Sequence, residues 1–302
     1  MKILIKFLTY HSFKHTLFKI HVLIALYFLL PVSNLLYAQH IDATLRFGHI
    51  TAENPTIIFK KYKPILNIIS KEIGAEVILV QTTSYSKMQK AFLDKEIDIG
   101  ILNTFSYITI SDKAELIPLV RRVMNKSGNY QSYIIVRKNG NIKGYSDIKG
   151  KILAFQDPYS TSGYLVPKIM LINNGIDPEK DLKEVLFIGT HDSIIYAVLN
   201  CTADVGTVAS YIFDSADPKI KDKIEVLEKS KPIPLGPMVI RRDLGKELAD
   251  KIKITMLGLE KSKEGRITLQ NAKLRRFEDA KDSDYDILRK MVEFLKKGDK
   301  GK

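Results

Sequence analysis

The stretch Asp157–Leu165, DPYSTSGYL, decides the fold because it connects a strand pattern to a helix pattern. The preceding residues, KILAFQ at Lys151–Gln156, are largely apolar and rich in strand-forming residues. The following residues, Tyr164–Asn174, carry apolar side chains at helical spacing and end at Gly175. A strand-to-helix turn of this kind places free backbone N–H groups, the positive end of the helix dipole and several hydroxyls together. The stretch therefore predicts an anion-binding turn.

The pattern of strand, turn and helix extends over much of the chain. Short apolar runs alternate with longer amphipathic ones, which is typical of an α/β protein with mainly parallel sheets. One helix is expected over Thr56–Ile73, with a kink at Pro64. The expected strands are Thr44–Ile50, Glu76–Gln81, Ile97–Leu102, Tyr133–Arg137, Val185–Ile188 and Ala203–Val208.

Two parts of the chain are similar to each other, which favours two similar lobes. Asp98-Ile99-Gly100 is followed by Phe105-Ser106-Tyr107-Ile108, and Asp204-Val205-Gly206 is followed by Ala209-Ser210-Tyr211-Ile212. The alternative is chance similarity between two short strand-turn units. Because ligands of open α/β sheets lie beyond the carboxyl ends of the strands, two facing lobes would bring their turns to one cleft.

The first 38 residues are typical of an export signal. They contain four lysines and no acidic residue, then an apolar core over Val22–Val32, then small and polar residues up to Ala38. We expect cleavage after Ala38 and a periplasmic mature protein. The apolar core is shorter than the about 20 residues of a membrane span. An uncleaved anchor is the alternative, because Leu35 and Leu36 extend the apolar stretch.

The net charge of +13 raises the question of a nucleic-acid partner. The lysines are scattered, and no basic stripe interleaved with aromatic residues is present, so we expect no nucleic-acid binding. A positive surface would instead speed the capture of a small anion. Cys201 is the only cysteine, which excludes an internal disulfide and a multi-cysteine zinc site. We expect neither a metal nor a cofactor.

Several segments, taken in order, resemble the substrate-binding proteins of phosphate, phosphite and phosphonate ABC transporters. The DPxSTSGxLVP pattern at Asp157–Pro167, followed by GxHD at Gly189–Asp192, is the specific part of the resemblance. Weaker matches are SYSKMQKAFLDKEIDIGIL, KPIPLGPMVIRRDL and RRFEDAKDSDYDILR. Together these segments cover nearly all of the chain that follows the export signal.

The resemblance implies an α/β fold of the two-lobed type II periplasmic binding protein class, with a mainly parallel sheet in each lobe. Residues 1–38 would be the signal peptide, residues 39–135 with 236–302 the first lobe, and residues 136–235 the second. The lobes would close over a small oxyanion by a hinge motion. The protein would then deliver the oxyanion to an ABC permease in the inner membrane, without catalysis of its own.

The resemblance also implies which residues bind the ligand. Three consecutive hydroxyl residues match the family's cradle for phosphonate or phosphate oxygens, one histidine meets the same oxygens, and two tyrosines line the other side of the cleft. An enclosed oxyanion needs several donors to replace its water, which hydroxyls, amides and an imidazole supply. The alternative is that the hydroxyls only cap a helix. The six residues are Tyr85, Tyr130, Ser160, Thr161, Ser162 and His191.

The chain departs from the family where aminoalkyl ligands are held. Members that bind an amine use two acidic residues, and the matching positions here are Gly236 and one residue within Ala209–Tyr211, none of them acidic. The family's GPFSY segment is replaced by Asn103-Thr104-Phe105-Ser106-Tyr107. We therefore expect a ligand without an amine: phosphate, phosphite or a simple alkylphosphonate.

Two other functions use the same residues. A hydrolase would combine Ser160 or Ser162 with His191 and a nearby aspartate, but no G-x-S-x-G elbow occurs and Asp192 adjoins His191 in sequence, where it is poorly placed to orient the ring. A binding protein of the same fold would alternatively present an oxyanion to a membrane-bound sensor kinase instead of a permease. The sequence leaves this second alternative open.

Overall fold

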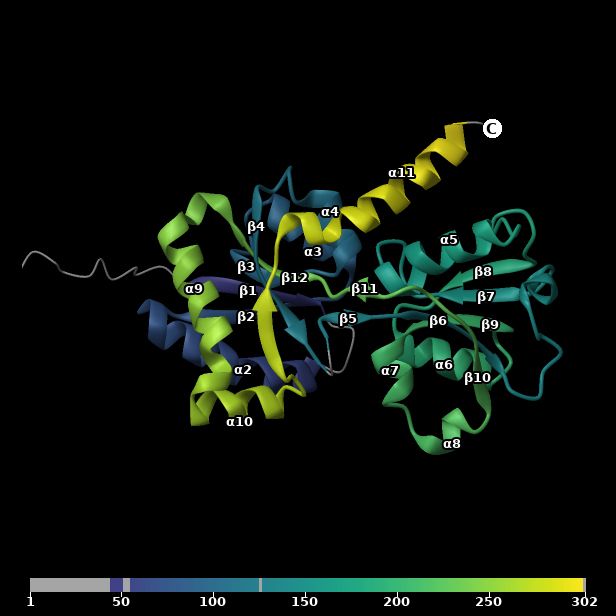
Figure 1. The fold of residues 1–302 in the computed structure, drawn as a ribbon, viewed down its shortest axis with the longest axis horizontal. Helices are drawn as coiled ribbons and strands as arrows, with labels where there is room; N and C mark the ends of the chain where they lie inside the picture. Colours follow the sequence, from purple (N-terminus) through teal and green to yellow (C-terminus); the bar gives the residue numbers. More distant parts are fainter. Residues whose placement is uncertain (1–43, 51–54, 125–126, 301–302) are drawn as a thin grey trace, which may run out of the picture. The chain divides into compact units, whose positions relative to one another are not determined.

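The computed structural model describes residues 44–50, 55–124 and 127–300, and these residues contain two large β-sheets (Figure 1). The first sheet has the strand order β13-β4-β12-β3-β1-β2. Strands β2, β1 and β3 pair in parallel, whereas β12 and β13 pair antiparallel with their neighbours. Its strands are β1 (Leu45–Ile50), β2 (Val77–Thr82), β3 (Ile99–Ile101), β4 (Leu116–Val123), β12 (Pro237–Arg241) and β13 (Arg276–Asp279).

The second sheet has the strand order β10-β6-β9-β7-β8. Strands β8, β7 and β9 pair in parallel, and β6 pairs antiparallel with both β9 and β10. Its strands are β6 (Ser132–Arg137), β7 (Ile152–Phe155), β8 (Glu184–Phe187), β9 (Val205–Ala209) and β10 (Ile224–Lys229).

The two sheets repeat one topology, as the internal similarity predicts. In the first sheet β1, β2 and β3 are joined by helices, and β7, β8 and β9 take the same places in the second. In each sheet the antiparallel neighbour, β12 or β6, comes from a segment that crosses between the sheets. The predicted α/β fold with parallel strands in each lobe is therefore confirmed, with antiparallel strands added on one side of each sheet.

The helices follow the strands as the sequence predicts. The helix expected at Thr56–Ile73 is α2 (Pro55–Ile73), which contains Pro64. The helix expected at Tyr164–Asn174 begins as a π-helix, η2 (Thr161–Leu165), and continues as α5 (Val166–Asn173). The others are α3 (Tyr85–Leu93), α4 (Thr104–Ile110), η1 (Tyr145–Ile148), α6 (His191–Leu199), α7 (Ser210–Asp214), α8 (Pro218–Lys221), η3 (Arg242–Leu244), α9 (Lys246–Gly258), η4 (Leu259–Lys261), α10 (Lys263–Asn271), η5 (Asp282–Tyr285) and α11 (Asp286–Lys300).

Each sheet has an apolar core on both faces, because successive strand residues point to opposite sides. In β6, Ile135 packs with α6, whereas Ile134 and Val136 pack in the core that includes Leu171 of α5. In the first sheet, α2, α9 and α10 pack together on one core (Figure 1), and α3 and α4 contribute to the other. The cores hold each sheet between its helices. The turns that follow the parallel strands lie at the carboxyl ends of those strands, outside the cores.

Two short strands connect the sheets. Strand β5 (Asn129–Tyr130) leads into β6, and β11 (Ile233–Pro234) leads into β12. The two strands pair antiparallel, with Tyr130 opposite Ile233. Strand pairing places Ser132 at the start of the second sheet, while the lobe boundaries at residues 135 and 236 stay predictions.

The predicted signal peptide, residues 1–38, lies outside the described residues. Within the described ranges, none of the helices has the length and apolar character needed to cross a membrane.

Candidate functional site

Ser160 caps the helical turn that follows β7. Its Oγ accepts a hydrogen bond from the backbone N–H of Gly163 at 3.0 Å and donates one to Gln156 Oε1 at 2.7 Å. The packing here is tight, because a Cβ on Gly163 would approach Gln156 Cβ to 2.5 Å. The hydroxyl of Ser160 therefore shapes the turn, in agreement with the helix-cap alternative.

Thr161 joins the same turn to the first sheet. Its Oγ1 accepts a hydrogen bond from the backbone N–H of Phe105 at 2.9 Å and donates one to Asn103 Oδ1 at 3.1 Å. Asn103 caps α4 and also donates from Nδ2 to the carbonyl of Tyr159 at 3.1 Å. The loop after β3 and the loop after β7 are thus held together by three hydrogen bonds.

Tyr130 reaches this turn from β5. Burial raises the pKa of its phenol most, Tyr211 raises it further, and hydrogen bonds with Ser162 and Thr161 oppose this without reversing it. The phenol therefore stays protonated at neutral pH. Ser162 is held from behind, since Ser132 Oγ donates to its backbone carbonyl at 2.6 Å.

Tyr85 reaches the turn from the start of α3. Burial is the main cause that raises the pKa of its phenol, Tyr211 adds to the increase, and hydrogen bonds with Asn103 and Gln156 lower it in part. The ring of Tyr211, in α7, lies 5.5 Å from that of Tyr130. The buried hydroxyl turn, the buried Tyr85 and the half-buried Tyr130 and Tyr211 therefore form one uncharged cluster of donors and acceptors.

His191 is the first residue of α6 and is buried. Burial lowers the pKa of its imidazole to about 4, and a hydrogen bond to the backbone carbonyl of Thr207 opposes this, so the ring is neutral at pH 7. Its Nδ1 is buried without a hydrogen-bond partner among the described residues. Thr207 also connects His191 to the hydroxyl turn, because Thr207 Oγ1 donates to the carbonyl of Gly163 at 2.9 Å.

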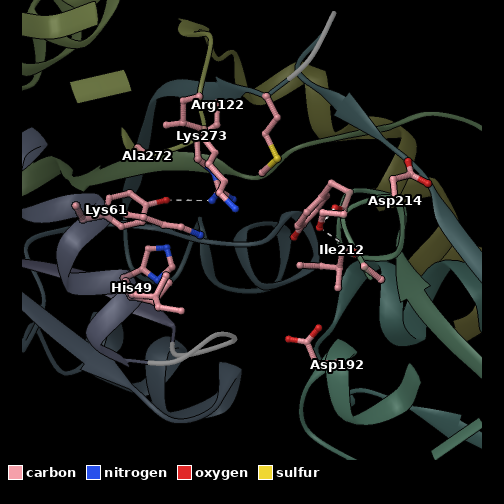
Figure 2. Close-up of a pocket in the computed structure, with 16 residues that line it drawn as sticks. His49, Lys61, Arg122, Asp192, Ile212, Asp214, Ala272 and Lys273 are labelled. Carbon is pink, nitrogen blue, oxygen red and sulfur yellow. Dashed lines mark hydrogen bonds between the residues drawn. The ribbon is translucent and has the colours of Figure 1, made fainter. Parts of the chain in front are cut away.

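A cavity of about 600 Å³ lies between elements of the two sheets (Figure 2). His49, Lys61 and Arg122 reach it from the first sheet and its helix α2, while Asp192 and Asp214 face it from α6 and α7. Its other lining residues are Ile57, Ile58, Tyr62, Met124, Tyr211, Ile212, Ser215, Ala216, Ala272, Lys273 and Leu274. Tyr211 thus belongs both to this cavity and to the tyrosine cluster beside the hydroxyl turn.

The first-sheet wall of the cavity is positively charged. His49 stacks on Tyr62 with ring centroids 4.4 Å apart, and its Nδ1 lies 2.7 Å from the carbonyl oxygen of Ile50. Burial first, then the charges of Arg122 and Lys61, lower the pKa of His49 to about 3. Burial is the larger cause, and the two cations that line the same cavity add a positive potential at this wall.

The structure adds residues to the predicted site. Asn103 and Tyr211 contact the predicted residues, and Arg122 and His49 line the cavity. The sequence patterns above give none of these four residues a role in binding. The internal repeat contains the signal for Tyr211, which stands at the place of Tyr107 in the first copy. For Arg122 the signal is a pair of arginines within an apolar strand, because strand alternation sends one of the two toward each face.

The sequence pattern of one protein family matches residues 47–285. That family comprises the periplasmic substrate-binding proteins of phosphonate ABC transporters. The chain belongs to this family. Members of this family are transport proteins that bind a substrate rather than enzymes, and the match spans the hydroxyl turn, both tyrosines, His191 and both sheets.

Two curated relatives are similar to this chain in sequence. The phosphate-import protein PhnD of Mycolicibacterium smegmatis is 29% identical over 231 residues, which is 72% of this chain and 72% of that protein. The phosphonates-binding periplasmic protein of Escherichia coli is 28% identical over 243 residues, which is 78% of this chain and 71% of that protein.

Solved structures of phosphonate-binding proteins share the fold. A binding protein of a phosphonate ABC transporter from Pseudomonas aeruginosa has a TM-score of 0.77 at 24% identity, covering 85% of this chain and 88% of that one. A Prochlorococcus marinus protein solved with methylphosphonate has a TM-score of 0.75 at 23% identity, covering 84% and 98%. The predicted type II periplasmic binding protein fold is therefore confirmed.

Proposed function

We propose that this protein captures a small phosphorus oxyanion between its two lobes and delivers it to an ABC permease in the inner membrane. The ligands proposed are phosphate, phosphite and simple alkylphosphonates. The observation that carries the proposal is the buried cluster of uncharged donors around Ser162, Tyr130 and Tyr85, together with the unpartnered Nδ1 of His191. Relatives named for phosphate import and for phosphonate binding support the ligand class.

The cluster suits an oxyanion because it replaces water without adding a fixed charge. A phosphoryl group that leaves water loses hydration unless each oxygen finds a donor, and hydrogen bonds to a charged oxygen are the stronger kind. Phenols that stay protonated donate at neutral pH. The imidazole of His191 donates a hydrogen bond from its other nitrogen to the carbonyl of Thr207, so its Nδ1 can accept a hydrogen bond from the P–OH group of a hydrogenphosphate or hydrogenphosphonate.

An amine-bearing ligand is not part of the proposal. Ala209 is fully buried and carries no charge. Gly236 has no room for a side chain, because a Cβ there would lie 2.0 Å from the carbonyl oxygen of Leu102. Neither Gly236 nor any residue within Ala209–Tyr211 can present the carboxylate that the family uses for an amine.

Isothermal titration calorimetry with phosphate, phosphite, methylphosphonate and aminoethylphosphonate tests the ligand class. We expect binding of one or more of the first three, and weaker or no binding of the amine. Ser162→Ala should weaken binding by about 1 to 3 kcal/mol, the effect of leaving a charged oxygen without a donor. Ser146→Ala, at an exposed serine, is the matched control and should leave the affinity unchanged. Absence of heat with all three anions, or equal affinity in both variants, contradicts the proposal.

We further propose export with cleavage after Ala38. Expression of the full chain with fractionation of the periplasm, followed by intact mass measurement, tests this step. A measured mass equal to that of a chain beginning at Gln39 supports cleavage, and a full-length chain retained in the membrane contradicts it.

The lobes 39–135 with 236–302, and 136–235, are proposed to close over the ligand by bending at the paired segments β5 and β11. Small-angle scattering with and without a saturating anion tests the motion. A decrease in the radius of gyration supports closure, and an unchanged radius with bound ligand contradicts it.

A further inference from the structure

Arg122 holds a positive charge that no carboxylate neutralises in the part of the chain that the structure describes. Its Nη1 donates to the hydroxyl of Tyr62 at 3.1 Å, and its Nε is buried with no hydrogen-bond partner. The adjacent Arg121, on the opposite face of β4, shows the usual arrangement. It pairs with Glu278 at 2.7 Å and with Asp284 at 3.5 Å.

A guanidinium without a carboxylate partner is suited to bind an anion that does not belong to the chain. A guanidinium stays protonated in proteins and has five N–H donors, and its burial is unfavourable unless an opposite charge and hydrogen bonds compensate. Tyr62 and Tyr211 lie close to Arg122, but neutral phenols do not cancel its charge. Lys61 lines the same cavity and adds a second positive charge to this wall.

Two tyrosines lie between the Arg122 guanidinium and the hydroxyl turn. Arg122 is within electrostatic reach of Tyr211 and Tyr130. Tyr130 in turn hydrogen-bonds with Ser162 and Thr161. Tyr211 lines the cavity together with Arg122, and its ring lies 5.5 Å from that of Tyr130, so a ligand that extends from the hydroxyl turn past these tyrosines would enter the cavity that Arg122 lines. The cavity of about 600 Å³ has the volume of an organic ligand's pocket and not that of a lone tetrahedral ion.

We propose that the site accepts phosphonates that carry a carboxylate, with the phosphonate at the hydroxyl turn and the carboxylate on the Arg122 guanidinium. This inference rests on the proposed function and narrows its ligand class. A carboxylate matches the planar fork of a guanidinium and leaves room for two parallel hydrogen bonds. Lys61 supplies additional positive potential, while simple phosphonates occupy the hydroxyl turn alone.

The opposite wall offers a competing account. Asp192 and Asp214 line the same cavity, so Arg122 would alternatively pair with one of them when the lobes close over any ligand. The two accounts differ in ligand dependence. A pair between the lobes strengthens the binding of every ligand, whereas a carboxylate subsite strengthens only ligands that have a carboxylate.

The experiment compares ligands of equal length that differ in charge. Calorimetric titration with propylphosphonate and phosphonopropionate gives the matched pair, and phosphonoacetate and phosphonobutyrate vary the distance between the acid groups. Methylphosphonate reports the hydroxyl turn alone, and aminoethylphosphonate reports the aspartates. We expect one carboxylate ligand to bind about ten- to hundredfold more tightly than propylphosphonate, as for a charged hydrogen-bonded pair.

The variants locate the effect. Arg122→Gln should remove the about ten- to hundredfold carboxylate gain while its methylphosphonate affinity changes less than about threefold. The methylphosphonate titration also shows that the variant is folded. Arg242→Gln removes the same charge from an exposed residue and should retain the gain.

Three outcomes overturn the inference. In the first, the wild type binds propylphosphonate and every carboxylate ligand with equal affinity. In the second, Arg122→Gln loses as much affinity for methylphosphonate as for the carboxylate ligands. In the third, aminoethylphosphonate binds most tightly of all. The first outcome with intact methylphosphonate binding leaves the proposed function standing. Absence of binding for all phosphonates and for phosphate and phosphite removes both.

Discussion

Thr161 Oγ1 donates a hydrogen bond to Asn103 Oδ1 at 3.1 Å and so connects the loop after β7 to the N-cap of α4. Thr161→Val keeps the shape of the side chain but leaves the Phe105 N–H, at 2.9 Å in the wild type, without an acceptor. We expect a loss of about 1 to 3 kcal/mol in the free energy of unfolding, since an unsatisfied buried donor loses its hydration. Urea denaturation measures it.

The control for this change is Thr109→Val. Thr109 is exposed in α4, and its Oγ1 donates only to the carbonyl of Phe105 in its own helix. Its substitution should shift the unfolding free energy by no more than about 0.5 kcal/mol. Equal effects of the two variants would show that the connection between the loops adds no stability.

Gly163→Ala should destabilise the protein by about 1 to 3 kcal/mol through overpacking. The added Cβ would lie 2.5 Å from Gln156 Cβ and 2.9 Å from Ser160 Oγ, so the capping hydrogen bond must shift. Gly258→Ala is the matched control, because a Cβ there meets nothing within 4 Å at the end of α9. It should stabilise by up to about 1 kcal/mol. Thermal unfolding of both variants measures these changes in stability. A higher melting temperature for Gly163→Ala than for the wild type would contradict the overpacking expected at this position.

Asp98→Asn should cost about 3 to 5 kcal/mol, as expected when one member of a buried ionic network is removed. The Asp98 carboxylate accepts a hydrogen bond from Arg46 Nε at 2.9 Å and forms an ion pair with Arg241 Nη1 at 3.0 Å. Desolvation alone would raise the pKa of Asp98, but these arginines outweigh it and lower the pKa. The stability they contribute is present above the ordinary carboxyl pKa and is lost as the pH falls below it.

Asp94→Asn provides the comparison for Asp98. Asp94 pairs with Lys90 one helical turn away on the exposed surface. Exposed pairs of this kind contribute little to stability, because water and salt screen them. Urea denaturation of both variants at neutral pH should separate them clearly, and similar midpoints would show that the Asp98 network adds little.

His191→Gln should reduce the acid sensitivity of the ligand-free protein. The pKa of His191 is lowered from 6.5 to about 4 in the folded state, so its neutral form is favoured by folding. This contribution is complete above about pH 6.5 and is lost as the pH falls, about 3 kcal/mol by pH 4. The difference in unfolding free energy between wild type and His191→Gln should therefore change with pH over this range. A constant difference contradicts a neutral buried ring.

The binding of methylphosphonate should take up protons at alkaline pH. The methylphosphonate dianion has no acidic proton, and the Nδ1 of His191 is an acceptor, so the bound pair of imidazole and phosphoryl group holds a proton that the free partners lack. Calorimetry in buffers of different ionisation enthalpy measures the uptake. It should be smaller in His191→Gln, and equal uptake in the two proteins would place the proton elsewhere.

The sequence predicts the two sheets and the turn after β7 because these depend on local patterns. Asp98-Ile99-Gly100 and Asp204-Val205-Gly206 lie in equivalent parallel strands, β3 and β9, as their similarity indicates. The DPYSTSGYL stretch ends a strand and starts a helical turn where periodicity places it. Capping of that turn by Ser160 also follows from residue type alone.

Other features depend on partners far away in the sequence. The Thr161 hydroxyl is used by Phe105 and Asn103, more than fifty residues earlier. The role proposed for Arg122 depends on its having no carboxylate partner among the described residues, and no local sequence pattern states which residues will lie near it. The antiparallel strands β6 and β12 enter their sheets through crossing segments, which alternation alone does not reveal.

Tyr130 lies in one of the two chain segments that cross between the sheets, directly opposite Ile233 in the other. Under the proposed function, a twist of this ribbon turns the phenol that contacts the ligand, so bending and ligand contact fall on one residue. The proposal then implies that recognition and lobe rotation are mechanically coupled, and that the bound ligand sets the angle at which the two lobes face a permease.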